Sequence, residues 1–277
     1  MSEAMHGALA IEGLGKVYDT GRERVSALEG CNLAIGAGDF LALVGPSGCG
    51  KSTLLNILAG FDQPTSGTVK LDGTILAAAD RPASPGPDRI VVFQEGALFP
   101  WKTVLENVTY GLKVQRRTDP AVAQERALEI LARCGGLDRI THQYPGQISS
   151  GMQRRVELVR ALINDPKVLL LDEPFRAMDT VSKGQMHQHL LDIHRQFPKT
   201  VFFITHDLEE AILLADSVAV MTTRPGRIRM QVAVNLPRPR HPKMVTSAEF
   251  VRLKDQLISA VHEEAKKAFE RGERELA

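Results

Sequence analysis

Residues 40–60 read FLALVGPSGCGKSTLLNILAG, and they carry the strongest indication of the fold. Phe40–Gly45 is a short apolar run that ends in glycine, which predicts a buried strand. The residues after it fit the pattern G-x-x-x-x-G-K-[ST]. A helix should follow, because Leu54, Leu55, Leu58 and Ala59 recur at helical spacing before Gly60 ends it. A strand, a glycine-rich loop and a helix in this order predict a phosphate-binding loop.

Each residue type in this loop suits a phosphate group. Glycines let the backbone point N–H groups at phosphate oxygens, and the following helix presents its positive end. Lys51 is expected to reach the β- and γ-phosphates, and Ser52 to ligate Mg²⁺. A glycine-rich turn that binds nothing is the alternative. The predicted phosphate-binding residues are Gly45, Pro46, Ser47, Gly48, Cys49, Gly50, Lys51, Ser52 and Thr53.

Two acids follow a second apolar strand, VLLLDEP at residues 168–174. In enzymes with a phosphate-binding loop, the first acid after such a strand holds Mg²⁺ and the second activates water. Asp172 is therefore the predicted metal ligand and Glu173 the predicted general base. The alternative is an acidic pair that faces solvent at the end of a strand.

Strands alternate with helices along most of the chain, which predicts an α/β fold with a largely parallel, buried sheet. Residues 8–35 and 68–76 contain shorter strand signals, and the helical stretch at about 96–160 resembles an insertion. Further strands are expected at residues 90–93, 201–205 and 218–221. Helices are expected from residue 104 to about 137 and at residues 153–163, 186–195 and 208–215.

Composition restricts the class of protein. The 277 residues carry 34 Lys and Arg against 33 Asp and Glu, a net charge of +1, which argues against a nucleic-acid binder driven by bulk basicity. Three separated cysteines, Cys31, Cys49 and Cys134, argue against a disulfide framework. Neither a signal peptide nor a membrane-spanning run is visible, so a cytosolic protein is expected.

A phosphate-binding loop is shared by kinases, GTPases, DNA-dependent ATPases and transporter motors. No guanine-reading N-K-x-D motif is present, which disfavours a GTPase. Residues 148–155, ISSGMQRR, resemble the signature motif of ATP-binding-cassette (ABC) ATPases, L-S-G-G-Q. This resemblance implies a P-loop NTPase cassette over residues 8–234, with a RecA-like parallel-sheet core, an antiparallel β subdomain and a helical subdomain at about 96–160.

Four further motifs of that family occur in order. Tyr18 matches the aromatic residue that stacks on adenine, and Gln94 matches the Q-loop glutamine. Residues 177–179 resemble the D-loop, with Asp179 as its acid, and His206 matches the switch histidine. Taken singly, each has an ordinary interpretation: a half-buried tyrosine, a surface glutamine, a helix-capping aspartate and a residue at a helix start.

The resemblance implies a mechanism in which two copies pair head to tail and sandwich ATP. Ser149 and Gly151 of the signature of one copy would contact the nucleotide bound by the other. Lys51 and Mg²⁺ would neutralise the phosphates, with Ser52, Gln94 and Asp172 as the implied metal ligands. Catalytic roles are implied for Glu173, His206, Gln94 and Lys51.

Several positions depart from the family pattern. Ser150 replaces the second signature glycine, Gln153-Arg154-Arg155 permutes the commoner R-Q-R order, and Arg176 replaces a glycine before the D-loop. These departures bear on turnover and on dimer geometry rather than on ATP binding. Cys49 adds a thiol to the loop, so alkylation there should block nucleotide binding and ATP should protect.

Residues 93–101, FQEGALFPW, resemble a segment of importer ATPases for nitrate, taurine and alkyl sulfonates, as do residues 103–108, 223–228 and 237–240. This implies a separate membrane permease, contacted near Trp101, and indirectly a solute-binding protein, at the cytoplasmic face of the inner membrane. No nucleic-acid partner is expected. A soluble ABC ATPase of DNA repair or translation is the alternative. Residues 235–277 should form a linker and an amphipathic helix with Phe250, Leu253, Leu257 and Val261 on one face.

Overall fold

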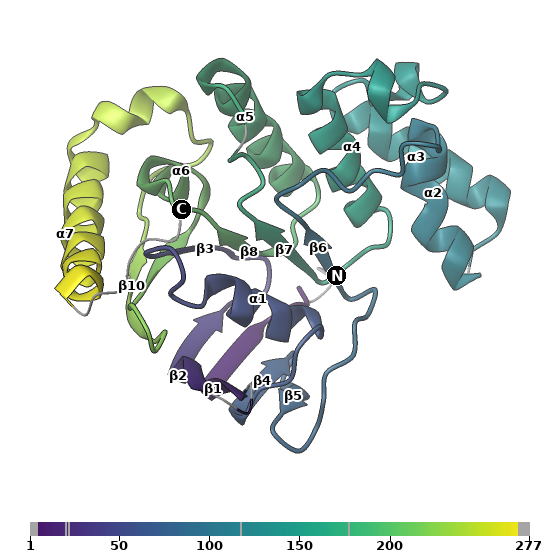
Figure 1. Ribbon diagram of the computed structural model, residues 1–277. Helices are drawn as coiled ribbons and strands as arrows, with labels where there is room; N and C mark the ends of the chain where they lie inside the picture. Colours follow the sequence, from purple (N-terminus) through teal and green to yellow (C-terminus); the bar gives the residue numbers. More distant parts are fainter. Residues whose placement is uncertain (1–4, 20, 22, 117, 177, 271–277) are drawn as a thin grey trace.

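The computed structural model describes residues 5–19, 21, 23–116, 118–176 and 178–270, apart from the side chains of residues 268 and 269. Two sheets pack face to face with one helix between them (Figure 1). The smaller sheet has the strand order β2-β1-β4-β5 and is antiparallel. Its strands are β1 (Leu9–Asp19), β2 (Arg24–Ile35), β4 (Ser66–Leu71) and β5 (Thr74–Ala78).

The larger sheet has the strand order β10-β9-β3-β8-β7-β6. Every pair except β10 with β9 is parallel, which confirms the predicted sheet type. Every residue of β3 and β8 is buried, as their apolar sequences predict. The strands are β3 (Phe40–Val44), β6 (Arg89–Val92), β7 (Val168–Asp172), β8 (Thr200–Ile204), β9 (Ser217–Met221) and β10 (Ile228–Ala233).

Helix α1 (Lys51–Ala59) lies between the two sheets, and its apolar side chains join both to one core. It ends at Gly60, whose φ of 82° is the left-handed conformation that favours glycine at a helix end. The opposite face of the larger sheet is covered by α4 (Ser150–Leu162), α5 (Thr180–Gln196) and α6 (Leu208–Leu214). The phosphate-binding loop therefore sits where the sheets meet α1.

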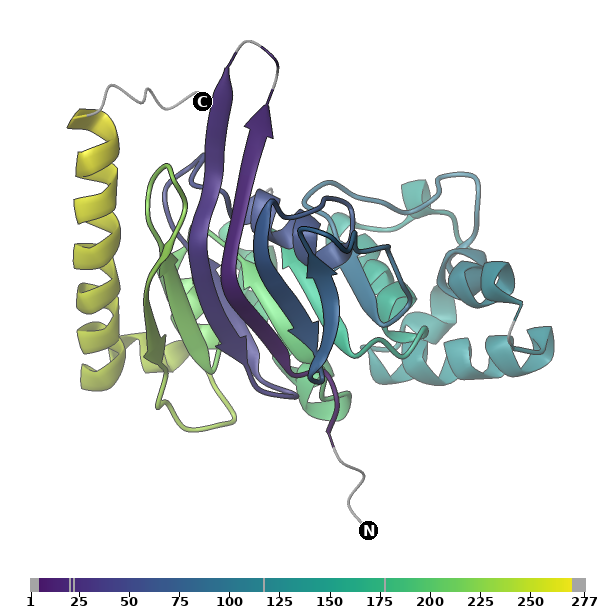
Figure 2. The same cartoon turned by 90° about the horizontal axis from the view of Figure 1, so that it is seen from below.

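The helical segment extends to one side of the sheets (Figure 2). It contains α2 (Val104–Gln115), α3 (Pro120–Arg133), the short 3₁₀ turns η1 (Leu137–Ile140) and η2 (Pro145–Gln147), and then α4. The single helical run expected at 104–137 is wrong. Arg116 takes a left-handed conformation at the end of α2, and Asp119 caps α3 ahead of Pro120, so local signals divide the run.

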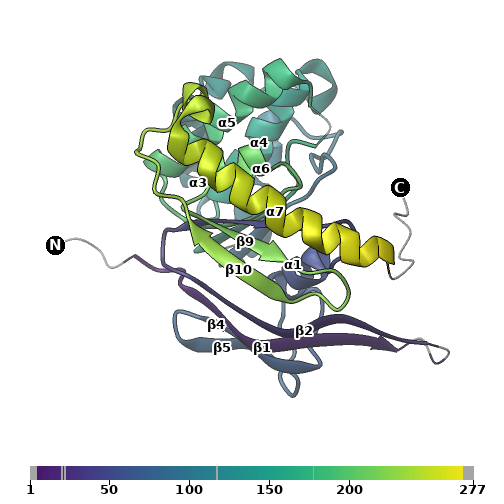
Figure 3. The ribbon, with the colours of Figure 1, turned by 90° about the vertical axis from the view of Figure 1, so that its left-hand side faces the viewer.

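The C-terminal segment packs on the rest of the molecule. After the 3₁₀ turn η3 (Pro242–Thr246), α7 (Ala248–Glu270) runs across the sheet beside β9 and β10 (Figure 3). Phe250, Leu253 and Leu257 are buried in the core, which confirms the predicted apolar face. The boundary at residues 234–235 stays a prediction. No helix in the described ranges is long and apolar enough to cross a membrane.

Candidate nucleotide site

The loop between β3 and α1 packs tightly against the antiparallel sheet. Gly48 and Gly50 have φ angles of +72° and +104°, which favour glycine. A Cβ atom on Gly50 would lie 2.8 Å from Leu28 Cδ2 and 2.9 Å from the Ala27 carbonyl oxygen. Helix α1 starts at Lys51, so its first N–H groups are available at the loop. This backbone cradle fits a phosphate group.

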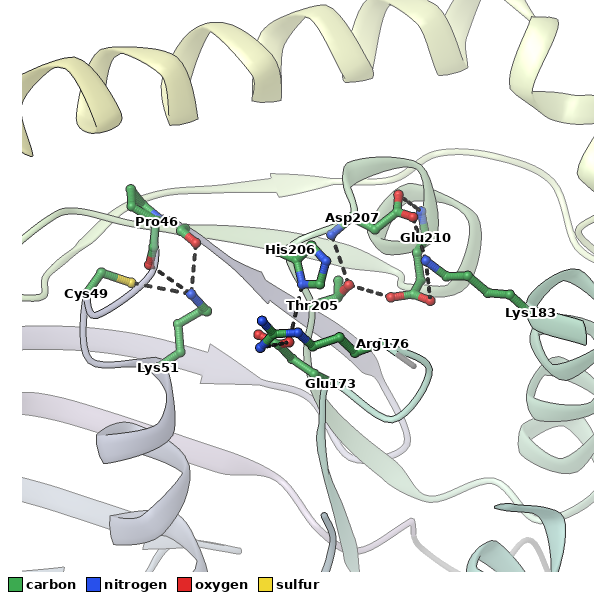
Figure 4. Close-up of polar contacts among 11 residues, drawn as sticks. Pro46, Cys49, Lys51, Glu173, Arg176, Lys183, Thr205, His206, Asp207 and Glu210 are labelled. Atoms are coloured by element: carbon green, nitrogen blue, oxygen red, sulfur yellow. Dashed lines mark hydrogen bonds and ion pairs between the residues drawn. The ribbon is translucent and has the colours of Figure 1, made fainter. Parts of the chain in front are cut away.

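Lys51 is held in place by the same loop. Its Nζ donates hydrogen bonds to the carbonyl oxygens of Gly45 and Pro46 at 2.8 and 2.9 Å, and contacts Cys49 Sγ at 3.8 Å (Figure 4). The side chain is buried. The ammonium therefore stands over the cradle, where a phosphate would be neutralised.

The Cys49 thiol is much less accessible than the sequence suggests. The residue is 1% exposed, and burial raises the pKa of the thiol although the Lys51 ammonium opposes this. Because the thiolate is the reactive form, alkylation should be slow in the folded protein. That alkylation blocks nucleotide binding stays a prediction.

Asp172 and Glu173 lie at the carboxyl end of β7, close to the loop. Burial and the charge of Glu173 raise the pKa of Asp172, while the Lys51 ammonium opposes the shift. Glu173 has a φ of 41°, which is uncommon for a residue with a side chain, and its N–H donates to the Ile204 carbonyl at 3.0 Å. Such strained backbone often aims a side chain at a functional site.

Glu173 and His206 meet at one oxygen atom. His206 Nδ1 lies 3.3 Å from Glu173 Oε2, and Arg176 Nη1 lies 3.3 Å from the same oxygen (Figure 4). The other carboxylate oxygen has no such contact in the part of the chain that is described. The structure thus brings the predicted base and the predicted switch histidine together, and it adds Arg176, which the sequence marked only as a departure.

Gln94 follows β6 and is exposed. Two residues that sequence reasoning missed shape its loop. Arg154 donates to the carbonyl oxygens of Phe93 and Gln94, both at 2.7 Å, and Glu157 accepts from the N–H of Ala97 at 2.6 Å. Arg154 and Glu157 are buried and paired at 2.6 Å. The permuted order at residues 153–155 was the sequence feature that could have revealed Arg154, because it places an arginine on the buried face of α4.

The remaining predicted residues make their hydrogen bonds outside the group formed by Lys51, Glu173 and His206. Tyr18 on β1 donates its hydroxyl to Asp62 Oδ2 at 2.7 Å, and its ring is partly exposed. Ser149 caps α4, where its hydroxyl accepts from the Met152 N–H at 3.3 Å. Asp179 caps α5 through the N–H groups of residues 181 and 182. Ala177 lies outside the described residues.

The signature residues Ser149 and Gly151 do not bond to the phosphate-binding loop of the same chain in the ranges that the structure covers. Ser149 is exposed, and Gly151 is partly so. Within one copy, the two predicted anion-binding elements therefore remain separate.

The oxygen donors present suit a magnesium ion that takes most of its ligands from phosphate and water. Ser52 is exposed at the start of α1, and Asp172 lies near Lys51 at the end of β7. No group of three or more His, Cys, Asp or Glu residues forms a metal cage among the described residues. Magnesium commonly binds through one or two protein ligands plus substrate phosphates, so this sparse set fits it.

The family model described as ABC transporter matches residues 28–176 of the chain. The chain belongs to the ABC transporter family. The nitrate import ATP-binding protein NrtD of Synechocystis sp. is 41% identical over 262 residues, which are 91% of this chain and 94% of the relative. The bicarbonate transport ATP-binding protein CmpD of Synechocystis sp. is 43% identical over 235 residues, 84% of this chain and 80% of the relative.

A solved ABC cassette shares the fold. The dimeric structure of MJ0796 in a post-hydrolysis state, bound to ADP and Pi, has a TM-score of 0.68 and 32% identity, covering 83% of this chain and 100% of that one. The predicted P-loop ABC fold is confirmed. This ABC protein is an ATPase whose cofactors are ATP and Mg²⁺, as predicted. The roles of its individual site residues stay predictions.

Proposed function

We propose that this chain is the ATP-hydrolysing subunit of an ABC importer that drives uptake of a small solute, of the nitrate, sulfonate or taurine kind, through a separate permease. The observation that carries the ATPase site is the meeting of Glu173 and His206 at 3.3 Å, at the end of β7. The importer assignment rests on the relatives, which are named for nitrate import and bicarbonate transport. Both names refer to small anions.

The proposed roles of the site residues follow from their positions around the phosphate-binding loop. Lys51 and the N–H groups of residues 48–52 would hold the phosphates, and Ser52, Asp172 and Gln94 would hold the magnesium ion. That ion would supply charge neutralisation at the phosphates. Glu173 accepts the proton of the attacking water through its uncommitted oxygen, and His206 holds the other oxygen. Tyr18 stacks on the adenine from the antiparallel sheet.

The first test replaces Glu173 by glutamine, which keeps the shape of the side chain and removes the base. We expect kcat for ATP hydrolysis to fall about 10²- to 10⁴-fold while ATP affinity stays within about twofold. Glu129→Gln on α3, an exposed residue, is the matched control and should keep wild-type turnover. Wild-type kcat in Glu173→Gln would reject Glu173 as the base.

We propose a head-to-tail dimer as the hydrolysing unit, because Ser149 and Gly151 of one copy make no bond to its own phosphate-binding loop in the described ranges. The dimeric arrangement of the related cassette with ADP and Pi supports this. Since Glu173→Gln should bind ATP without hydrolysing it, light scattering should show a dimer with ATP and a monomer after ATP is removed. Ser149→Arg, which adds bulk to the signature, should then prevent dimerisation. A Glu173→Gln chain that stays monomeric at saturating ATP would contradict this unit.

An exposed aromatic surface beside Gln94 is the proposed permease contact. Trp101 is 70% exposed and lies beside Phe99, whose ring also packs on Tyr110. A cavity of about 280 Å³ opens next to these rings between α2, α4 and β6, with Phe93 and Asn164 in its wall. Exposed aromatic side chains around a cavity are typical anchors of protein interfaces. Binding there would place the protein peripherally on the inner face of the membrane.

The permease contact is tested by Trp101→Ala. Loss of an aromatic anchor costs about 2 kcal/mol, so affinity for the permease should fall about thirtyfold, with the basal ATPase rate unchanged. Val122→Ala, at an exposed apolar residue of α3, is the control. In wild type, permease with loaded solute-binding protein should stimulate ATPase activity. Stimulation by DNA or ribosomes instead would favour the alternative assignment.

A further inference from the structure

A buried polar cluster lies directly behind His206 and outside the nucleotide site. It consists of Lys183 and His187 on α5 together with Thr205, Asp207 and Glu210 at the turn from β8 into α6. Figure 4 shows the members other than His187 on the side of His206 away from the phosphate-binding loop. None of these residues has a role in the site described above.

Glu210 is the centre of this cluster. It is 3% exposed, and its two oxygens accept from different elements. Oε1 lies 2.7 Å from His187 Nε2 and 3.6 Å from Lys183 Nζ, whereas Oε2 accepts the hydroxyl of Thr205. A buried carboxylate is costly without partners, so Glu210 depends on all of these contacts to be stable at this position.

The contacts of Glu210 fix the backbone on both sides of His206. Thr205, just before it, is buried, and its hydroxyl donates to Glu210 while accepting from the Asp207 N–H at 3.0 Å. Asp207, just after it, accepts from the N–H of Glu210 at 3.2 Å. His206 itself is exposed and reaches out to Glu173. An exposed imidazole is thus carried on an anchored peptide.

The same cluster ties this turn to α5. Lys183 Nζ donates to Asp207 Oδ2 at 2.7 Å, and the Lys183 N–H donates to the Asp179 carbonyl at 2.8 Å. Asp179 is the cap of α5 and the predicted D-loop acid. The first turn of α5 and the histidine turn are therefore joined by a charged, partly buried hydrogen bond between Lys183 and Asp207.

We propose that Glu210 is a positioning residue for ATP hydrolysis: through Thr205 and Asp207 it holds His206 against Glu173, and through Lys183 and His187 it links His206 to the start of α5. This inference rests on the proposed role of His206. The side chain of Glu210 does not touch the reacting atoms, so its effect should fall on kcat and not on nucleotide affinity.

Glu210→Gln tests the positioning role, because it keeps the volume and removes one acceptor oxygen. We expect kcat to fall about tenfold or more, with KM and ATP affinity within about twofold, since small misplacements of catalytic groups are expensive. Thr205→Val should give the same kcat loss through the other end of the contact, and it remains informative if Glu210→Gln folds poorly. Glu209→Gln, the exposed neighbour on α6, is the control and should turn over normally.

A double-mutant cycle with His206→Ala separates positioning from a general structural effect. If Glu210 acts through His206, Glu210→Gln should cost almost nothing further in kcat once His206 is absent. Full additivity, or wild-type kcat in Glu210→Gln and Thr205→Val, would overturn the proposal. Wild-type kcat in His206→Ala itself would instead reject the proposed role of His206, so the two failures are distinguishable.

Discussion

At the scale of single residues, Glu173 makes a contact that the family pattern does not predict. Its carboxylate meets both His206 and Arg176, and Arg176 stands where the family usually has glycine. The Arg176 side chain is 57% exposed, so its ion pair with Glu173 is screened by water and salt. This ion pair should therefore have only a modest effect on the rate of ATP turnover.

Arg176→Gly should release the carboxylate from one donor and increase kcat. Because exposed ion pairs are worth about 0–1 kcal/mol, the increase should not exceed about fivefold. Arg176→Lys, which keeps the charge, should stay near wild type. The measurement is steady-state ATPase activity at low and at about 1 M salt, where screening should remove the difference. A large loss of kcat in Arg176→Gly would show that Arg176 assists the reaction instead.

At the scale of elements, α5 carries a charged contact at its first turn and an aromatic contact at its last turn. Its first turn joins the histidine turn, and its last turn places His194 on the buried face of the sheet. His194 packs edge-on against Phe40 of β3, with the two ring centroids 5.5 Å apart. Its Nε2 lies 3.0 Å from the Lys199 carbonyl oxygen, at hydrogen-bond distance. Burial lowers the pKa of His194 below its usual 6.5, although the bond to the Lys199 carbonyl opposes this.

This shift predicts how stability changes with pH. The unfolded chain takes up a proton on His194 near its ordinary pKa of 6.5, whereas the folded protein resists until a lower pH. The free energy of unfolding should therefore decrease as pH falls from about 6.5 through the folded pKa, and His194 should contribute no slope above that window. His194→Gln should reduce the loss of Tm between about pH 7.5 and 5.5. His262→Gln, exposed on α7, should leave the slope unchanged.

At the scale of the whole molecule, the nucleotide site is assembled from distant segments at one edge of the parallel sheet. The loop after β3, the acids after β7 and the histidine after β8 meet because the carboxyl ends of parallel strands share that edge. The C-terminal helix also reaches this region. Glu264 of α7 accepts from the Thr223 N–H at 3.3 Å, and Arg224 donates to the Gly48 carbonyl at 3.2 Å.

Glu264→Ala should therefore affect both stability and nucleotide binding. Glu264 is buried and pairs with Arg229 at 2.9 Å and Lys267 at 2.7 Å, so its loss should lower the free energy of unfolding by about 1–3 kcal/mol. ATP affinity should fall as well, because the segment at Thr223 and Arg224 supports the loop. Urea unfolding and nucleotide titration measure the two effects. Glu263→Ala, which removes only an exposed ion pair with Arg229, should lower the free energy of unfolding much less and leave ATP affinity unchanged.

Local sequence was sufficient for most of the fold and for the nucleotide loop. Apolar runs predicted β3, β7 and β8, and the spacing of leucines predicted α1, because a strand buried on both faces and a helix between sheets leave a simple hydrophobic pattern. Strand β10 was missed although Ile228, Met230 and Val232 are apolar in alternation. None of its residues is fully buried, and pairing with β9 decides that it is a strand. The division of α2 from α3 depended on weak local signals at residues 116–119.

Motif order alone predicted the nucleotide-binding residues, because phosphate chemistry demands particular side chains at fixed spacing. The tertiary structure was needed to find the contacts of the charged side chains, most of which join segments far apart in sequence. Three contacts have no local signature: Arg154 with the Gln94 loop, Arg176 with Glu173, and Glu210 with His187. A charged residue at any of these positions also fits a solvated surface. Packing buries some of these charges, and a buried charge must find a partner. Folding therefore decided which of them support the site.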